Sequence, residues 1–347
     1  MKSKFFLILS ILVILLSACA SPFTAIKKVI TTTVPTNILT GLPGSNGPVL
    51  AVKIDDTPEA HPQIGLESAD VVYIEQVEGG LTRLAAIYSQ YPSAIPSQIG
   101  PVRSARISDL EILAQYGKVG FAFSGAQSKF HPKIDAANLV NLSADRQPSS
   151  IYSRDATRSA PTNLILNPEA LLTKTITKEG TSIDSVKSVG WNFGDISIDP
   201  KFIESNLIKR ITEADLVWPA SSYQVRWSAT LKKWLVDYRH QPDLVASGSQ
   251  ISVSTVVVQI VPITNSEYAD KLGGVTPFSN TVGSGLGYLL RDGWAIPITW
   301  TRTGAAEGTT FRLMDGSEAK FAPSQIWVAL CDKPPSFIYP PAPTPTK

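Results

Sequence analysis

The sequence predicts an α+β domain of α/β type, followed by a mostly β domain. In the first part, apolar runs typical of buried strands occur at 49–54, 71–77 and 119–123, with helical spacing between the last two. From Tyr223 onward the chain alternates strand-like runs with turn residues. Strands mixed with helices, followed by strands alone, indicate two domains of different class.

The start of the chain is predicted to be a targeting segment, residues 1–18. Lys2 and Lys4 precede an apolar run over 5–16, which is shorter than a bilayer-spanning helix. Small residues then lead to Cys19, the pattern of a bacterial lipoprotein signal whose cysteine is lipidated. We therefore expect an exported protein, anchored to the outer face of the cytoplasmic membrane through lipid on Cys19. An ordinary secretory signal with a chance cysteine is the alternative.

After the targeting segment the sequence divides into four parts. Residues 19–48 are rich in Thr, Pro, Gly and Asn, which predicts a lipidated cysteine followed by a flexible tether. Residues 49–193 hold the predicted α/β-type domain, and residues 194–332 hold the β-rich domain. The tail, 333–347, is rich in proline, which predicts an extended or disordered end.

Charge and cysteine content narrow the classes of partner. The chain has 31 Lys and Arg against 29 Asp and Glu, and it becomes formally neutral once Lys2 and Lys4 are removed. We predict no nucleic-acid partner, because such proteins carry a basic field. Besides Cys19 the only cysteine is Cys331, so no internal disulfide can form. A lone cysteine near a strand end is more often an apolar filler than a nucleophile.

The most informative stretch is 99–109, which reads Ile-Gly-Pro-Val-Arg-Ser-Ala-Arg-Ile-Ser-Asp. Pro101 suits the first position of a helix, and the apolar spacing after it predicts a helix from about Pro101 to Tyr116. Arg103 and Arg106 then share one face of its first turn. Positive charge is unfavourable at a helix N-terminus unless an anion lies nearby. That anion is either a carboxylate of the protein or a bound phosphate or carboxylate.

Several local patterns predict further elements. Gly79-Gly80 separates two strand-like runs and predicts a hairpin, and Asn167-Pro168 predicts a short helix with asparagine as its N-cap. The glycine-rich run 283–287 enters a strand, so it lacks the helix that a phosphate loop requires. Five tryptophans on predicted strands are expected to pack in or against the core, with a stacking platform for sugars as the alternative. They are Trp227, Trp234, Trp294, Trp300 and Trp327.

Motifs of the common catalytic classes do not occur in this sequence. There is no His-Glu-x-x-His, no Cys pair, no Walker loop and no Gly-x-Ser-x-Gly. His61 and His131 each precede a proline, which indicates turns more than catalysis. The sequence therefore identifies no catalytic residue and predicts no organic cofactor.

Two sets of charged residues form the candidate site. Arginine guanidinium groups grip phosphates and carboxylates, while carboxylates at a strand end hold Mg²⁺ or Ca²⁺. The alternative is that the two sets neutralise each other in a buried ion network. The anion-binding candidates are Arg83, Arg103, Ser104, Arg106, Arg154 and Arg158. The acidic or metal-binding candidates are Asp55, Asp56, Glu75, Glu78 and Asp109.

The order of these motifs resembles that of the YerB-like bacterial lipoprotein family. The motifs are Asp55-Asp56, the run 75–83, the run 99–106 and the loop 152–163. The resemblance covers nearly all of the mature chain, and it implies a two-part domain of unknown function behind a lipidated signal. The sequence departs from the family pattern at Thr162, where we expect histidine before Asn163.

Three functions fit these observations. In the first, the protein is a non-catalytic envelope lipoprotein that binds an anionic or glycan ligand, such as a cell-wall polymer, or a protein partner. In the second, it is a phosphate-handling enzyme acting on cell-wall precursors or polymers, with a divalent ion on Asp55 or Asp56. In the third, it is a structural adaptor whose charges form a buried network. A cavity lined by the arginines favours the first two.

Overall fold

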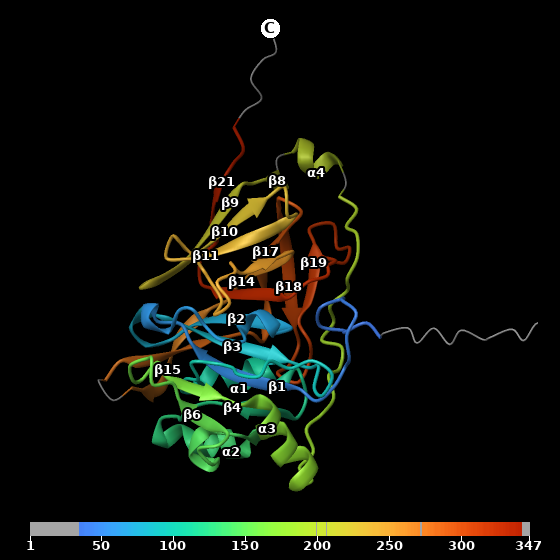
Figure 1. The fold of residues 1–347 in the computed structure, drawn as a ribbon. Coiled ribbons are helices and arrows are strands. Elements are labelled where there is room, and N and C mark those ends of the chain that lie inside the picture. The colour runs from blue at the N-terminus through green and yellow to red at the C-terminus, as the bar shows by residue number, and fades with distance from the viewer. Residues whose placement is uncertain (1–34, 199, 206, 271–272, 342–347) are drawn as a thin grey trace, which may run out of the picture. The chain divides into compact units, whose positions relative to one another are not determined.

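One mixed β-sheet contains strands from both halves of the chain (Figure 1). The N-terminal half is the part of the chain that holds β1 to β7, and the C-terminal half is the part that holds β8 to β21. The computed structural model describes residues 35–198, 200–205, 207–270 and 273–341. The N-terminal strands are β1 (Leu50–Asp55), β2 (Val71–Gln76), β3 (Thr82–Tyr88), β4 (Val119–Ala122), β5 (Leu139–Asn141), β6 (Tyr152–Arg154) and β7 (Leu164–Leu166). The predicted targeting segment and Cys19 lie outside the described residues.

The C-terminal half is mostly strands, as predicted. They are β8 (Lys209–Arg210), β9 (Glu213–Trp218), β10 (Ser221–Ser228), β11 (Lys233–Tyr238), β12 (Gln241–Pro242), β13 (Ser252–Val253), β14 (Thr255–Ile260), β15 (Ile263–Ala269), β16 (Val275–Ser279), β17 (Gly283–Arg291), β18 (Trp294–Arg302), β19 (Thr310–Leu313), β20 (Ile326–Cys331) and β21 (Ser336–Ile338).

Helices are few and short, and most of them lie in the N-terminal half. The α-helices are α1 (Ile107–Ala114), α2 (His131–Ala136), α3 (Pro168–Leu172), which continues as a π-helical turn (Thr173–Lys178), and α4 (Pro200–Glu204). The 3₁₀ turns are Pro58–Ala60, Leu66–Ser68, Glu78–Gly80, Ser128–Phe130 and Ala144–Arg146. Asn167 caps α3 as predicted, because its Oδ1 accepts a hydrogen bond from Ala170 N.

The large sheet has eleven strands, in the order β19-β18-β17-β14-β20-β2-β3-β1-β4-β5 with β8 beside β18. Its centre is the parallel pair of β20 and β2, in which Ile326 lies opposite Val71. A strand of the C-terminal half therefore pairs directly with one of the N-terminal half. The predicted hairpin of β2 and β3 is present, with Gly79 and Gly80 at positive φ in its turn.

The central strands of the large sheet are buried on both faces, because they are mostly apolar at successive positions. In β1, Leu50 and Val52 pack on one face, whereas Ala51 packs on the other. A second sheet, β12-β11-β10-β9-β21 with β13 beside β11, covers the first face. Helix α1 covers part of the other face through Ile112 and Leu113.

The predicted helix over 101–116 is wrong at its start, because α1 begins six residues later than Pro101. Arg103 is held in extended backbone by hydrogen bonds to neighbouring segments of the sheet. Its N donates to Lys53 O at 2.8 Å, and Ser124 N donates to its O at 2.9 Å. Arg106 is the N-cap residue. Arg106 alone therefore lies at the helix N-terminus, and Arg103 is held beside β1.

The predicted flexible segments are ordered in part. Within 35–48, Leu39 is completely buried, and Asn37 Nδ2 donates to Ser89 Oγ at 2.9 Å. Within the predicted disordered tail, β21 pairs with β9 in antiparallel fashion. Apolar burial and strand pairing therefore outweigh the polar and proline-rich composition in these parts. The rest of the tether and of the tail lies outside the described residues.

The tryptophans support the packing interpretation over a sugar platform. Trp234, Trp300 and Trp327 are each at most 1% exposed. Trp227 packs on Trp234, with ring centroids 5.1 Å apart, and Arg210 lies over the Trp294 ring. These rings are therefore committed to the core and its edge.

A charged cluster joins the second sheet to the N-terminal half. The His61 ring stacks on Tyr238 with centroids 4.0 Å apart, and its Nδ1 lies 2.8 Å from Asp243 Oδ1. Its Nε2 lies 3.2 Å from Asp56 Oδ1, which also accepts a hydrogen bond from Tyr223 OH. Burial lowers the pKa of His61, but hydrogen bonds to Asp243 and Asp56 outweigh it and raise the pKa to about 9.

This cluster predicts a pH-dependent contribution of His61 to stability. Because the folded-state pKa is above the ordinary value of 6.5, the contribution is complete below pH 6.5 and disappears as the pH rises through about 9. The difference in unfolding free energy between wild type and His61→Gln is expected to reach about 3 kcal/mol at the acid end. Chemical denaturation across this pH range measures it. A difference independent of pH would mean that His61 acts only by stacking on Tyr238.

Candidate functional site

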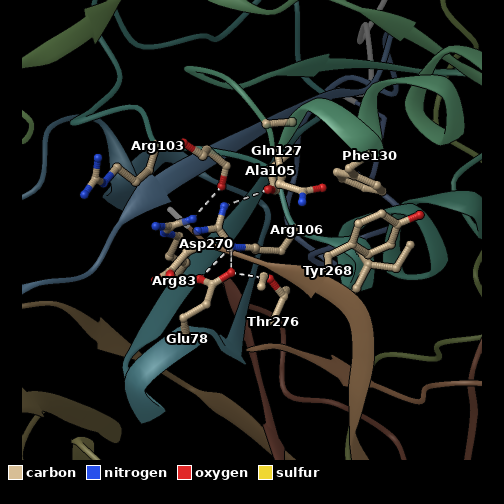
Figure 2. A pocket seen from close by; sticks show the side chains of 14 residues that line it. Glu78, Arg83, Arg103, Ala105, Arg106, Gln127, Phe130, Tyr268, Asp270 and Thr276 are labelled. Atoms are coloured by element: carbon tan, nitrogen blue, oxygen red, sulfur yellow. Dashed lines mark hydrogen bonds and ion pairs between the residues drawn. The ribbon is translucent and has the colours of Figure 1, made fainter. Parts of the chain in front are cut away.

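A pocket of about 410 Å³ opens where the segment before α1 meets the hairpin of β15 and β16 (Figure 2). It combines guanidinium groups from the N-terminal half with side chains from the C-terminal half. Four of the six predicted anion-binding candidates line it. The lining includes Arg83, Arg103, Ser104, Arg106, Glu78, Gln127, Phe130, Tyr268, Asp270 and Thr276.

Arg106 is neutralised inside the pocket by Glu78. Arg106 Nε donates to Glu78 Oε2 at 2.7 Å, and its Nη1 donates to Ala105 O at 2.9 Å. Thr276 Oγ1 donates to the other Glu78 oxygen. Burial raises the pKa of Glu78, but Arg106 and Thr276 outweigh it and lower the pKa, so Glu78 stays ionised.

Arg103 pairs with Asp55 at the edge of the pocket. Arg103 Nε lies 2.9 Å from Asp55 Oδ2, although the two atoms are not aligned as a hydrogen bond. The other oxygen, Asp55 Oδ1, accepts from Asp56 N at 2.9 Å. The Arg103 side chain is 24% exposed, and in Figure 2 it points away from Arg83 and Arg106. Arg103 is therefore a rim residue with a partner of its own.

Arg83 is a buried arginine that lines the pocket. It is 9% exposed, and its Nη1 donates to Ser104 O at 2.9 Å. Within the described residues, no carboxylate forms an ion pair with it. Burial, followed by the charges of Arg106 and Arg103, lowers the pKa of Arg83 to about 9, although the charges of Asp55 and Glu78 act against the shift. Arg83 is therefore still charged at neutral pH.

A fully buried lysine, Lys53, engages one of the two carboxylates that lie opposite Arg83 in the sheet. In the sheet Arg83 lies between Asp55 and Glu75, so the three side chains share one face. Glu75 instead contacts Lys53 Nζ, which also donates to Asp109 Oδ1 at 2.8 Å. Burial lowers the pKa of Lys53 to about 8, although Asp109 acts against the shift. The nearby acids are thus already engaged with other cations.

Arg302 is a second buried arginine, and its hydrogen bonds can be compared with those of Arg83. It is 1% exposed, and four acceptors surround its guanidinium. They are Glu307 O, Thr281 Oγ1, Glu111 O and Ala305 O. A buried arginine of this kind is satisfied by its own chain. Arg83, by contrast, has one such acceptor and faces a pocket.

Comparison with known proteins places the chain in a family. Residues 39–182 match the family described as "Protein of unknown function (DUF3048) N-terminal domain", and residues 214–328 match its C-terminal domain. The chain belongs to the DUF3048 family. The two matched regions correspond to a mixed-sheet half with few helices and a half made mostly of strands.

One relative and one solved structure agree with the predicted family. A stretch of 57 residues is 46% identical to "Putative lipoprotein YerB" of Bacillus subtilis (strain 168), covering 16% of each chain. The crystal structure of the YerB protein from Bacillus subtilis is similar to this chain, with a TM-score of 0.70 and 18% identity. That similarity covers 86% of this chain and 97% of the other, and it shows the fold. The predicted resemblance to YerB-like lipoproteins is confirmed.

In this DUF3048 protein, the remaining predicted anion candidates lie outside the pocket. Arg154 donates to Asn163 Oδ1, and Arg158 donates to the carbonyls of Ala60 and Pro62. Arg154 is therefore held within its own loop, and Arg158 joins that loop to the segment of Ala60 and Pro62. No helix in the described part of the chain is long and apolar enough to cross a membrane.

The predicted acidic or metal-binding residues do not converge on a common site. Asp55 faces Arg103, whereas Asp56 accepts hydrogen bonds from Tyr223 and Thr82 in the cluster around His61. Among the described residues, no three side chains of His, Cys, Asp or Glu converge as metal ligands do. Cys331 is buried on β20, and burial raises the pKa of its thiol, as expected of an apolar filler.

Sequence reasoning missed Lys53 and the apolar part of the pocket. Lys53 lies in the middle of an apolar strand, and a charge at such a position is the signal that could have marked it. Phe130 and Tyr268 line the pocket with ring centroids 5.2 Å apart. Tyr268 comes from the β15–β16 hairpin, which the sequence pattern did not predict.

The ion network predicts a large structural effect of Lys53. Replacing it in Lys53→Met leaves the buried carboxylates of Glu75 and Asp109 without their cation, which is expected to lower the unfolding free energy by about 3–5 kcal/mol. The double variant Lys53→Met/Glu75→Gln is expected to recover part of this loss. Chemical denaturation at neutral pH measures both. A Lys53→Met protein as stable as wild type would contradict a charged lysine at this position.

Proposed function

We propose that this protein is a membrane-anchored, extracytoplasmic lipoprotein that binds an anionic ligand of the cell envelope in the arginine pocket. Cys19, at the end of a lipoprotein-type signal, would carry the anchor, and the relative described as a lipoprotein supports this assignment. The ligand assignment depends on one observation. Arg83 is a buried cation that faces a pocket and has no carboxylate partner among the described residues.

An unpaired buried charge is unfavourable for folding, so its presence needs a reason. Removing a charge from water costs several kcal/mol, unless a partner of opposite charge repays it. The guanidinium of Arg302 has acceptors on all sides, whereas one protein acceptor is seen for the guanidinium of Arg83. The other N–H groups of Arg83 can therefore donate to a ligand. Local departures from good packing and pairing are concentrated at functional sites. A bound anion would supply the missing partner.

The other charged residues fit the structural interpretation. Lys53 with Glu75 and Asp109 fastens α1 to the sheet, and Arg103 with Asp55 fastens the segment before α1 to β1. We therefore assign anion binding to Arg83, and scaffolding to the Lys53 network and to the ion pairs of Arg103 and Arg106. The sequence left ligand binding and a buried ion network as alternatives for the charged residues. In this proposal, different residues of that group have the two roles.

The proposal predicts that Arg83 favours anion binding but lowers the stability of the protein without a ligand. Arg83→Met is expected to keep or raise the unfolding free energy, by up to about 3 kcal/mol, because it removes a buried charge that forms no ion pair in the described part of the chain. It is also expected to abolish stabilisation by small anions. Thermal unfolding of the full chain in detergent, in low-chloride buffer with and without inorganic phosphate, acetate or benzoate, measures both effects.

The matched control is Arg302→Met, another buried arginine replaced by the same residue. It leaves several carbonyl groups without donors, so it is expected to lower stability while stabilisation by anions persists. The proposal fails if no anion stabilises the wild-type protein and Arg83→Met is destabilised as much as Arg302→Met. Arg83 would then belong to the scaffold.

A further inference from the structure

We propose that the pocket takes an acylated amino acid or a peptide C-terminus, in which one carboxylate, a neighbouring amide N–H and an apolar side chain are recognised together. This inference rests on the proposed anion site and adds the chemical class of its ligand. Three independent features of the pocket carry it: the balance of charge, an unpartnered acceptor and an apolar wall.

The charge balance of the pocket favours a ligand with a single negative charge. Glu78 already neutralises Arg106, and Asp55 neutralises Arg103, which leaves one guanidinium for the ligand. A doubly charged group would have to displace Glu78 from both Arg106 and Thr276. The lining itself holds three arginines against Glu78 and Asp270, a formal excess of one positive charge. A carboxylate therefore fits this pocket better than a phosphate monoester or a pyrophosphate.

Gln127 supplies the second feature. Its Oε1 is buried and has no hydrogen-bond partner, although the residue lines the pocket. A buried acceptor without a donor is unfavourable, unless a ligand or water provides one. Figure 2 places Gln127 between the arginines and Phe130. A ligand whose carboxylate binds Arg83 would satisfy this oxygen with an adjacent amide N–H.

The third feature is the apolar wall. Phe130 and Tyr268 lie on the far side of Gln127 from Arg83 and Arg106 in Figure 2, with their ring planes tilted by 57°. Ile107 also lines the pocket. The volume of about 410 Å³ lies within the range of pockets for organic ligands, roughly 300–1,000 Å³, and exceeds what a small inorganic anion needs. An aromatic or aliphatic side chain next to the carboxylate would cover these rings.

Both halves of the chain recognise such a ligand. The arginines and Gln127 come from the N-terminal half, whereas Tyr268 comes from the β15–β16 hairpin of the C-terminal half. The hairpin is held over the arginines by Thr276, which donates to Glu78. The ligand's charged group thus contacts one half and its apolar group contacts both.

The test is a series of probes that each lack one feature of N-acetylphenylalanine. The amide N–H is missing in 3-phenylpropionate, the ring in N-acetylglycine, and the charge in N-acetylphenylalanine amide. Isothermal titration of the full chain in detergent is expected to show N-acetylphenylalanine binding about tenfold more tightly than the first two, and no binding of the amide. Pyrophosphate is expected to bind more weakly than N-acetylphenylalanine.

Two variants separate the parts of this inference. Gln127→Met keeps the length of the side chain but removes the acceptor, so it is expected to weaken N-acetylphenylalanine about tenfold and leave 3-phenylpropionate unchanged. Arg83→Met is expected to abolish the binding of both.

The outcomes distinguish this inference from the proposed function. If pyrophosphate binds more tightly than N-acetylphenylalanine in an Arg83-dependent way, the anion site stands and the ligand class is wrong. Equal binding of N-acetylphenylalanine and 3-phenylpropionate, unchanged by Gln127→Met, also overturns the ligand class. If no probe binds at all, both the site and the ligand class are wrong.

Discussion

The structure of the pocket depends on one buried cation, Lys53. Its ammonium lies between the carboxylates of Glu75 and Asp109, so it joins the three strands β1, β3 and β2 to the first turn of α1. Asp109 also accepts a hydrogen bond from Arg106 N, which sets where the helix begins. Because Lys53 engages Glu75, the neighbouring Arg83 is left without that partner. The scaffold and the proposed binding site are therefore two consequences of the same pairing.

Sheet continuity is the second constraint, because it brings the hairpin to the arginines. The parallel pairing of β20 with β2 joins the two halves, and β14 and β17 extend the sheet from there. The hairpin of β15 and β16 connects β14 to β17, so it emerges beside the N-terminal half. Thr276 meets Glu78 across 198 residues of sequence. Neither family region could form this pocket alone.

The elements that depend on short stretches of sequence were predicted correctly. The β2–β3 hairpin follows from Gly79-Gly80, the cap of α3 follows from Asn167, and most strands of the C-terminal half follow from alternation. The start of α1 was missed, because Arg103 is held extended by Lys53 and Ser124, which no local pattern reveals. The β15–β16 hairpin was missed, because its pairing is interrupted between Asn265 and Ala269 and the exposed positions of β15 are polar.

The sequence predicted which charged residues belong to the candidate site, but not which arginine pairs with which acid. The sequence could place arginines and acids in the same region, and a buried network or a ligand site was equally consistent with their numbers. Partner choice decides between the two, and it depends on which side chains share a face after folding. Arg103 and Arg106 find Asp55 and Glu78, whereas Arg83, directly between two acids in the sheet, finds neither. The residue that we propose for ligand binding is thus the one that the ion network leaves out.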